Sequence, residues 1–175
     1  IKKEYDFMYI CLKDNEKCEN GWQSYNRNWE FTEKCLDMMC NKFKLKGLLI
    51  GRINCKIPNT CHNLMELTDF MDYGKFIKNF NKIKFIFIPN KSDASPRVLT
   101  EAFCYDLPAL VNYNILGGWK YINNDTGVFF NDMNNFESRL SKLLNKIKNK
   151  EFNVREHFIN NYGSINSGKE LLNFV

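Results

Sequence analysis

Short apolar runs alternate with segments of helical periodicity, and this alternation constrains the fold more than any other feature. The expected strands are Tyr5–Cys11, Gly47–Gly51, Met65–Phe70, Phe85–Ile88 and Ala109–Val111; the expected helices are Trp29–Phe43, Tyr73–Phe80, Arg97–Tyr105, Phe136–Ile147, Arg155–Tyr162 and Gly168–Phe174. Strands that alternate with helices need crossover connections, so they form a parallel sheet with helices on both faces. The run FIFI at 85–88 has the continuous apolar character of a strand buried on both sides. The sequence therefore predicts an α/β, Rossmann-like fold.

The chain length fits one domain. Its 175 residues, 44% of them hydrophobic, are enough for a sizeable core. We expect a single domain over 1–175 whose last helices, from about 151, form a C-terminal tail. Because the first residue is Ile1, we expect the chain to be a piece of a longer protein.

The charge is mildly positive and carries little information about partners. A formal net charge of +5 comes mainly from lysine, and an excess of lysine attracts phosphorylated small molecules as well as nucleic acids. The stretch KLLNKIKNK at 142–150 would be the RNA-binding face of such a protein, but a solvated amphipathic helix explains it equally well. We therefore predict no nucleic-acid partner.

The cysteines show no regular framework, and their number is odd: Cys11, Cys18, Cys35, Cys40, Cys55, Cys61 and Cys104. Unpaired thiols in a reducing compartment are the simpler interpretation. No apolar run approaches the roughly 20 residues that span a bilayer, so we expect a soluble, cytoplasmic domain. Cys55, Cys61 and His62 lie close together but lack the C-x-x-C pair of a zinc site, and no metal is predicted.

The loop after the FIFI strand has the features of an anion site. Ser95 suits an N-cap and Pro96 a first helical residue, which leaves the amides of Arg97 and Val98 free at the positive end of the helix dipole. Ligands of open α/β sheets bind outside the carboxyl ends of the strands. This rule places Asn90–Ser95 at the binding edge, together with 15–26, which we expect to be irregular.

Two carboxylates bracket this helix start. Asp93 precedes it and Glu101 lies within it, with seven residues between them. Both acids can reach one ligand over the helix end, and a carboxylate suits the vicinal hydroxyls of a ribose. From spacing alone, Glu101 could instead complement the helix dipole and Asp93 could cap a turn.

The segment SDASPRVLTEAFCYDLPALVN resembles the carboxylate-x7-carboxylate motif of retaining glycosyltransferases of family four, which have a two-Rossmann-domain architecture. Asp93, Pro96, Glu101 with Ala102, and Pro108 stand at the motif's positions. The Gly117–Gly118 pair, and Thr126–Gly127 before an apolar strand at 128–130, resemble the segment that follows in the family. The resemblance identifies the chain as the C-terminal, donor-binding half.

The resemblance also implies a role for individual residues. Glu101 would hold the ribose, and Asp93, where the family usually has Glu, would contact the transferred sugar and act as the catalytic-site acid. Amides of Ser95, Arg97 and Val98 would hold sugar and phosphate. Arg27 takes the place of a diphosphate-binding Lys, and Lys13 is a weaker match to an Arg after the first strand. Phe70 and Met71 fall where the family places the nucleobase, although both residue types are more often core.

The implied activity is transfer of a glycosyl group, hexosyl or N-acetylhexosaminyl, from a nucleotide-diphosphate sugar with retention, and without a cofactor or an obligatory metal. An N-terminal domain would bind the acceptor, a glycan, lipid or protein, and could contact a membrane peripherally. A non-catalytic nucleotide-sugar-binding module and a nucleotide-sugar epimerase of related architecture remain alternatives. The sequence contains no G-x-x-x-x-G-K-[ST] and no G-x-S-x-G.

Overall fold

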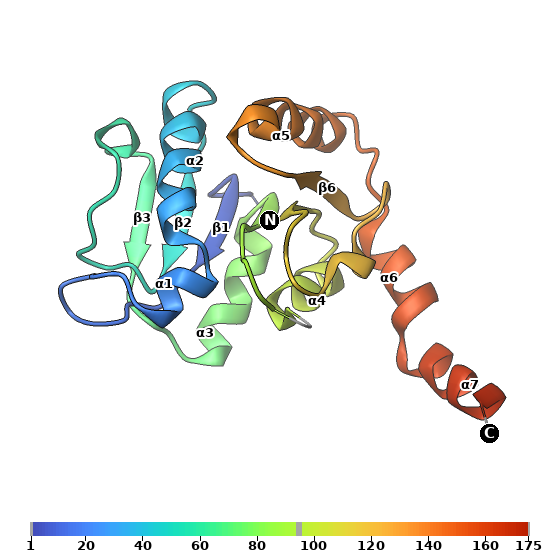
Figure 1. Cartoon of the computed structure of the whole chain (residues 1–175). Helices are drawn as coiled ribbons and strands as arrows, with labels where there is room; N and C mark the ends of the chain where they lie inside the picture. Colours follow the sequence, from blue (N-terminus) through green and yellow to red (C-terminus); the bar gives the residue numbers. More distant parts are fainter. Residues whose placement is uncertain (1, 94–95, 175) are drawn as a thin grey trace.

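The protein is built on a single six-stranded parallel sheet. The computed structural model describes residues 2–93 and 96–174. The strands are β1 (Phe7–Ile10), β2 (Gly47–Ile50), β3 (Met65–Thr68), β4 (Phe85–Ile88), β5 (Ala109–Asn112) and β6 (Gly127–Phe130), in the order β3-β2-β1-β4-β5-β6 (Figure 1). Every pair of neighbours is parallel. The predicted Rossmann-like fold is confirmed.

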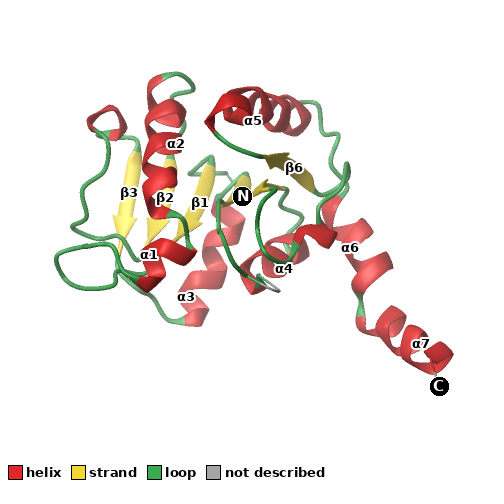
Figure 2. Ribbon diagram, in the orientation of Figure 1, coloured by secondary structure: helices red, strands yellow, loops and turns green. Residues whose placement is uncertain are grey.

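Helices cover both faces of the sheet (Figure 2). α2 (Trp29–Asn41) and α5 (Met133–Lys148) pack on one face, where they contact one set of alternating strand side chains, such as Phe7 and Tyr9. α4 (Arg97–Cys104) and α6 (Val154–Tyr162) pack on the other face against the intervening set, such as Met8 and Ile86. α3 (Tyr73–Lys78) and the 3-10 turn η2 (Asn79–Lys82) also contribute to this second core.

The strand order reverses at β1, and this reversal positions the site. The chain builds β2 and β3 on one side of β1 and then crosses to β4, β5 and β6 on the other. The two connections leaving the carboxyl ends of β1 and β4 therefore run in opposite directions and leave a crevice between them. The loops that follow Ile10 and Ile88 face this crevice.

One segment expected to be irregular contains a helix. Within 15–26 lies the short helix α1 (Trp22–Asn26), at the arrowhead end of β1 (Figure 1). The Asp14 carboxylate accepts hydrogen bonds from the backbone N–H groups of Gly21, Gln23 and Ser24. The sequence pattern missed α1 because a five-residue helix shows no periodicity, and its stabilising acid lies eight residues upstream of its start.

The expectation that the cysteines are unpaired was wrong for four of them. Cys18 is bonded to Cys55, with Cα atoms 5.6 Å apart, and Cys40 is bonded to Cys61, with Cα atoms 5.1 Å apart. The first bond joins the loop after β1 to the loop after β2; the second joins the end of α2 to the 3-10 turn η1 (Asn59–Cys61). Strand pairing brings these loops together, so spacing in the sequence could not reveal them. Cysteine usage therefore no longer supports a reducing compartment.

Of the two C-terminal helices, α6 packs on the domain and α7 (Ser164–Phe174) extends away from it. α6 is attached to α4 by the edge-on contact of Phe158 with Phe103, whose ring centroids lie 5.7 Å apart. α7 extends away from the sheet (Figure 1). No helix within 2–93 or 96–174 is long and apolar enough to cross a membrane.

The lysine-rich segment at 142–150 belongs to an amphipathic helix, as the alternative interpretation had it. Leu143 is buried in the core, and Leu144 and Ile147 pack against it. Lys146 is itself buried and donates a hydrogen bond to Oδ1 of Asn124 at 2.8 Å. At least one lysine of α5 is therefore buried in the protein and is not part of an exposed basic surface.

Gly51 should be required at the end of β2. Its φ is +88°, and a Cβ atom there would lie 2.7 Å from the backbone oxygen of Cys11. Gly51→Ala should therefore lower the free energy of unfolding by about 1–3 kcal/mol, measured by urea denaturation. Gly168→Ala is the matched control, because a Cβ there meets no heavy atom within 4 Å. Equal stability of both variants would contradict the close approach of β2 to the chain after β1.

Candidate functional site

Two adjoining hollows lie in the crevice at the carboxyl ends of β1 and β4. One has a volume of about 270 Å³ and the other about 240 Å³. Both are lined by Ile10, Arg27, Arg97 and Val98. They therefore form one continuous cleft, with these shared residues at its centre.

The two ends of the cleft differ in their lining. The first hollow adds Asp93, Asn90 and Pro96. The second adds Glu101, Phe70, Met71, Tyr73 and Gln23. The two predicted carboxylates thus lie at opposite ends, with the basic residues between them.

Arg27 is placed in the cleft by the turn between α1 and α2. Asn28 adopts the left-handed conformation, with φ 58° and ψ 48°, so the chain reverses into α2 directly after Arg27. The hydroxyl of Tyr9 on β1 donates to the Arg27 carbonyl at 2.9 Å. The Arg27 guanidinium then reaches Oδ2 of Asp93 at 3.2 Å, with both side chains about one-third exposed or less.

Two buried asparagines fix the loop that carries Asp93. The Asn28 amide donates to the Pro89 carbonyl at 3.0 Å, and the Asn112 amide donates to the carbonyls of Pro89 and Asn90 at 3.3 Å. The Asp93 N–H donates to the Leu116 carbonyl at 3.2 Å. Because buried carbonyls need partners, these bonds hold the loop to α2 on one side and to β5 on the other.

α4 begins one residue later than predicted. Pro96 has ψ 103° and is the N-cap, not the first helical residue, and its carbonyl accepts from the N–H of Leu99 at 3.0 Å. Ser95, the predicted N-cap, lies outside the described residues. The N–H groups of Arg97 and Val98 belong to the first turn of α4, at the positive end of its dipole, and both residues line the cleft.

Gly118 holds Pro96 in position. A Cβ at Gly118 would lie 2.5 Å from Cδ of Pro96, and the φ of this glycine is +72°. The Gly117–Gly118 pair therefore acts structurally here, because it lets the loop after β5 pack against the N-cap of α4.

Glu101 is held by two neighbours. The Tyr73 hydroxyl donates to Oε1 of Glu101 at 3.0 Å, and Nε of Arg97 lies 3.4 Å from the same oxygen. The hydrogen bond to the Glu101 carboxylate raises the pKa of Tyr73, so this phenol is protonated and donating at neutral pH. The Glu101 side chain is only 14% exposed, whereas that of Arg97 is 82% exposed.

The structure brings together most of the predicted residues. Arg27, Asp93, Arg97, Val98 and Glu101 all line the cleft. Phe70 and Met71 line its second hollow; Phe70 is 70% exposed, while Met71 also packs against the core.

Lys13 is the exception among the described predictions. It does not line either hollow, and its ammonium pairs with Glu16 at 3.1 Å.

The sequence pattern assigned no role to Tyr73, and it placed Asn90 and Gln23 at the binding edge only as members of the segments 90–95 and 15–26. Tyr73 opens α3 directly after the N-cap Asp72, whose carboxylate accepts from the Lys75 N–H at 3.0 Å. The predicted helix over 73–80 begins at the same residue, but its periodicity gives no sign that the Tyr73 side chain lines the cleft. Gln23 belongs to α1, which shows no periodicity.

The cleft offers positive groups to an anion and carboxylates to hydroxyl groups. Arg27, Arg97 and the first amides of α4 converge at its centre, where they suit a diphosphate. Asp93 and Glu101 are acceptors for hydroxyls at either end. Within the described part of the chain, no three His, Cys, Asp or Glu residues cluster as metal ligands would.

The fold is similar to that of several solved glycosyltransferases. The chain is similar to the C-terminal domain of a group 1 glycosyl transferase (LpcC) from Francisella tularensis, with a TM-score of 0.60 and 10% identity over 93% of this chain and 87% of that one. It is also similar to a glycosyltransferase from Rickettsia africae (TM-score 0.61, 16% identity, 98% of this chain and 47% of that one). The third is Staphylococcus aureus TarM, in a G117R mutant complex with fondaparinux, alpha-GlcNAc-glycerol and UDP (TM-score 0.67, 12% identity, 99% of this chain and 36% of that one).

These comparisons establish the fold as that of the C-terminal domain of two-domain glycosyltransferases. The chain spans less than half the length of TarM and of the Rickettsia protein. No protein-family model matches the sequence, and no curated protein matches it either.

Asn112 should be a main support of the cleft. Asn112→Ala removes the donor for the Pro89 and Asn90 carbonyls and should lower the free energy of unfolding by about 1–3 kcal/mol. Amide exchange at Lys91 and Asp93 should accelerate in the same variant. Asn114→Ala is the control, because its amide makes an exposed bond to the Asn131 carbonyl. Unchanged exchange in the Asn112 variant would show that other contacts hold this loop.

Proposed function

We propose that this chain is the donor-binding domain of a retaining glycosyltransferase whose donor is a nucleotide-diphosphate sugar. The order of groups along the cleft carries the proposal. Glu101, Phe70 and Met71 line one hollow, Asp93 lines the other, and Arg27, Arg97 and Val98 line both. A nucleotide sugar has the same order: nucleoside, diphosphate, sugar.

Each part of the donor then meets a group of matching chemistry. The ribose hydroxyls donate to Glu101, and the base lies against Phe70 and Met71. The diphosphate accepts from Arg27 and from the amides that open α4. The hydroxyls of the transferred sugar donate to Asp93, whose shorter side chain, compared with Glu, brings the sugar close to the β4–α4 loop.

The catalytic contribution of this domain is to stabilise the departing diphosphate. The Tyr9 bond fixes the backbone of Arg27, and the Asn28 and Asn112 bonds fix the start of the loop that leads to α4, so these groups need little reorganisation as negative charge develops. This arrangement needs no metal and no cofactor. A second domain would bind the acceptor, which is a glycan, lipid or protein. The isolated chain should therefore bind donor better than it transfers sugar.

Removal of the Arg27 charge should weaken diphosphate binding selectively. UDP-, GDP- and ADP-sugars are first screened by calorimetry, and the best nucleotide is carried forward. Arg27→Ala should bind the nucleoside diphosphate about tenfold more weakly or worse, because a charged hydrogen bond contributes about 1.5–3 kcal/mol. The bare nucleoside should bind almost as to the wild type.

Lys13→Ala is the matched control for Arg27, since Lys13 is also cationic and follows β1 but points to Glu16. Equal losses in the two variants would mean that general positive charge, and not the cleft, attracts the diphosphate. A strict magnesium requirement with wild-type binding by Arg27→Ala would overturn the metal-free mechanism.

Asp93 should discriminate between the nucleotide sugar and the nucleoside diphosphate. Asp93→Asn removes an acceptor for sugar hydroxyls and should weaken binding of the nucleotide sugar about tenfold. The same change releases the Arg27 guanidinium from its 3.2 Å ion pair, so affinity for the nucleoside diphosphate should stay equal or rise. Calorimetry with both ligands measures the difference, with Asp37→Asn on α2 as control. A parallel fall for both ligands would assign Asp93 to loop structure alone.

A further inference from the structure

Helix α1 carries two aromatic side chains that the cleft does not use. Trp22 is 72% exposed and Tyr25 is 58% exposed. Their rings stack with centroids 6.3 Å apart and an interplanar angle of 21°. Residues three apart share one side of a helix, while Gln23 and Arg27, on the other side, line the cleft. We call the two rings the Trp22–Tyr25 platform.

The exposed rings of Trp22 and Tyr25 do not contribute the stability that they would contribute if they were buried. Burying a large apolar side chain contributes about 1.5–3 kcal/mol. Trp and Tyr combine an apolar ring with a polar group, and they are enriched where a partner is bound. Two stacked, exposed rings beside a ligand cleft are therefore better explained by contact with a ligand than by packing.

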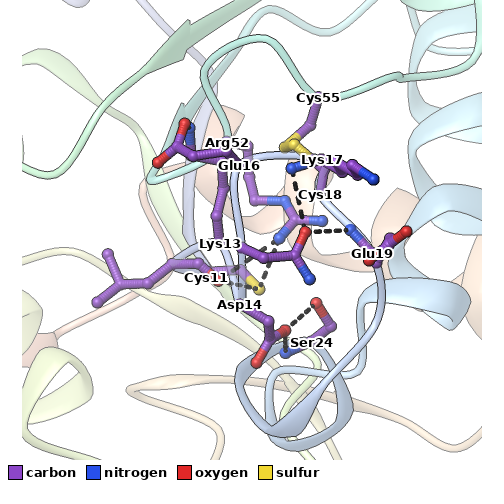
Figure 3. The surroundings of a disulfide bond; sticks show 12 residues. Cys11, Lys13, Asp14, Glu16, Lys17, Cys18, Glu19, Ser24, Arg52 and Cys55 are labelled. Atoms are coloured by element: carbon purple, nitrogen blue, oxygen red, sulfur yellow. Dashed lines mark hydrogen bonds and ion pairs between the residues drawn. A yellow bond between two sulfur atoms is a disulfide. The ribbon is translucent and has the colours of Figure 1, made fainter.

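The platform is held rigidly by the loop that precedes it. A five-residue helix is not stable by itself, but the Asp14 carboxylate accepts from the N–H of Gln23 at 2.6 Å. It also accepts from the N–H of Ser24 at 2.9 Å and from Oγ of Ser24 at 2.6 Å (Figure 3). Burial alone would raise the pKa of Asp14, but the Ser24, Gln23 and Gly21 hydrogen bonds outweigh it and lower that pKa. The carboxylate is thus ionised and fully able to accept at neutral pH.

A covalent bond fixes the same loop. The Cys18–Cys55 disulfide ties it to the chain after β2 (Figure 3). Within the loop, Oδ1 of Asn15 accepts from the N–H groups of Lys17 and Glu19. Such preorganisation lowers the conformational entropy that a ligand-binding loop loses on binding. The segment 14–26 is therefore ordered in detail, although it adds little to either core.

The platform is also connected to the sugar end of the cleft. The Lys91 ammonium lies 4.2 Å from the Tyr25 ring centroid, and the Lys91 N–H donates to the Asn26 carbonyl at 2.9 Å. Lys91 stands two residues before Asp93 in the same loop. The platform is therefore joined through Lys91 to the loop that carries Asp93.

The polar groups around the platform suit an uncharged, hydroxyl-rich ligand. A hollow of about 240 Å³ is lined by Tyr25 together with the polar side chains of Asn20, Ser24, Glu30 and Lys91. These side chains offer donors and acceptors, and their one cation and one anion balance. A pyranose matches this pattern, because its C–H face packs against an aromatic ring and its hydroxyls reach polar groups at the rim.

We propose that the Trp22–Tyr25 platform is a subsite for a neutral pyranose residue of the acceptor. The inference deepens the proposed function, on which it rests, by assigning the acceptor to neutral carbohydrate chains. One sugar of the acceptor would stack on α1 and present a hydroxyl to the donor across the loop of Asp93, while the second domain would bind the rest of the acceptor.

Ligand-observed NMR tests the platform directly on the chain. Maltotetraose, cellotetraose, chitotetraose and mannotetraose are used as probes by saturation transfer, with and without UDP. At least one should bind, and Trp22→Ala and Tyr25→Ala should each weaken it about tenfold. Phe174→Ala is the matched control, because that aromatic side chain is 93% exposed on α7 and should leave binding unchanged.

The donor measured in parallel separates the two proposals. Trp22→Ala should bind UDP or the preferred nucleotide like the wild type, and Arg27→Ala should lose nucleotide but keep the oligosaccharide. Failure of all four oligosaccharides to bind, with nucleotide still bound, would overturn the platform and leave the donor site standing. Loss of nucleotide in Trp22→Ala would reassign the platform to the nucleobase. Binding of a hydrophobic peptide, with no binding of any sugar, would also overturn the proposal of a pyranose subsite.

Discussion

The parallel pairing of β1 with β4 is the contact on which the rest of the structure depends. Phe7 pairs with Phe85 and Met8 with Ile86, although these residues are far apart in the chain. This pairing joins the two halves of the sheet at the position where the strand order reverses. It thereby sets the loop after β1 and the loop after β4 side by side, and neither loop forms the cleft without the other.

Charge in the cleft is organised by ion pairs that a ligand would share. Arg27 contacts Asp93, and Arg97 contacts Glu101, so each cation is already held near an acid. Pairs of this exposure add little to stability, but they fix the directions of the side chains. The buried Asn28 and Asn112 fix the backbone, because their amides donate to the Pro89 carbonyl.

The loop before α2 is ordered by contacts with distant parts of the chain. Its order comes from Asp14 within the loop, from the bond of Cys18 to Cys55 after β2, and from Lys91 after β4. These three contributions come from segments that are far apart in the sequence. The same loop delivers Arg27 to one side and the Trp22–Tyr25 platform to the other, so donor and acceptor chemistry would be linked through one rigid element.

The sequence alone determined the architecture and most of the cleft. Buried strands such as FIFI at 85–88 are continuous apolar runs, and the acids Asp93 and Glu101 bracket a helix start; both are local patterns that strand burial and helix capping make visible. The tertiary structure alone decided the two disulfides, α1, the Tyr73–Glu101 bond and the turning of Lys13 away from the cleft. Each of these depends on residues brought together by sheet pairing, such as Cys18 with Cys55, and contacts of that kind leave no periodicity in the chain.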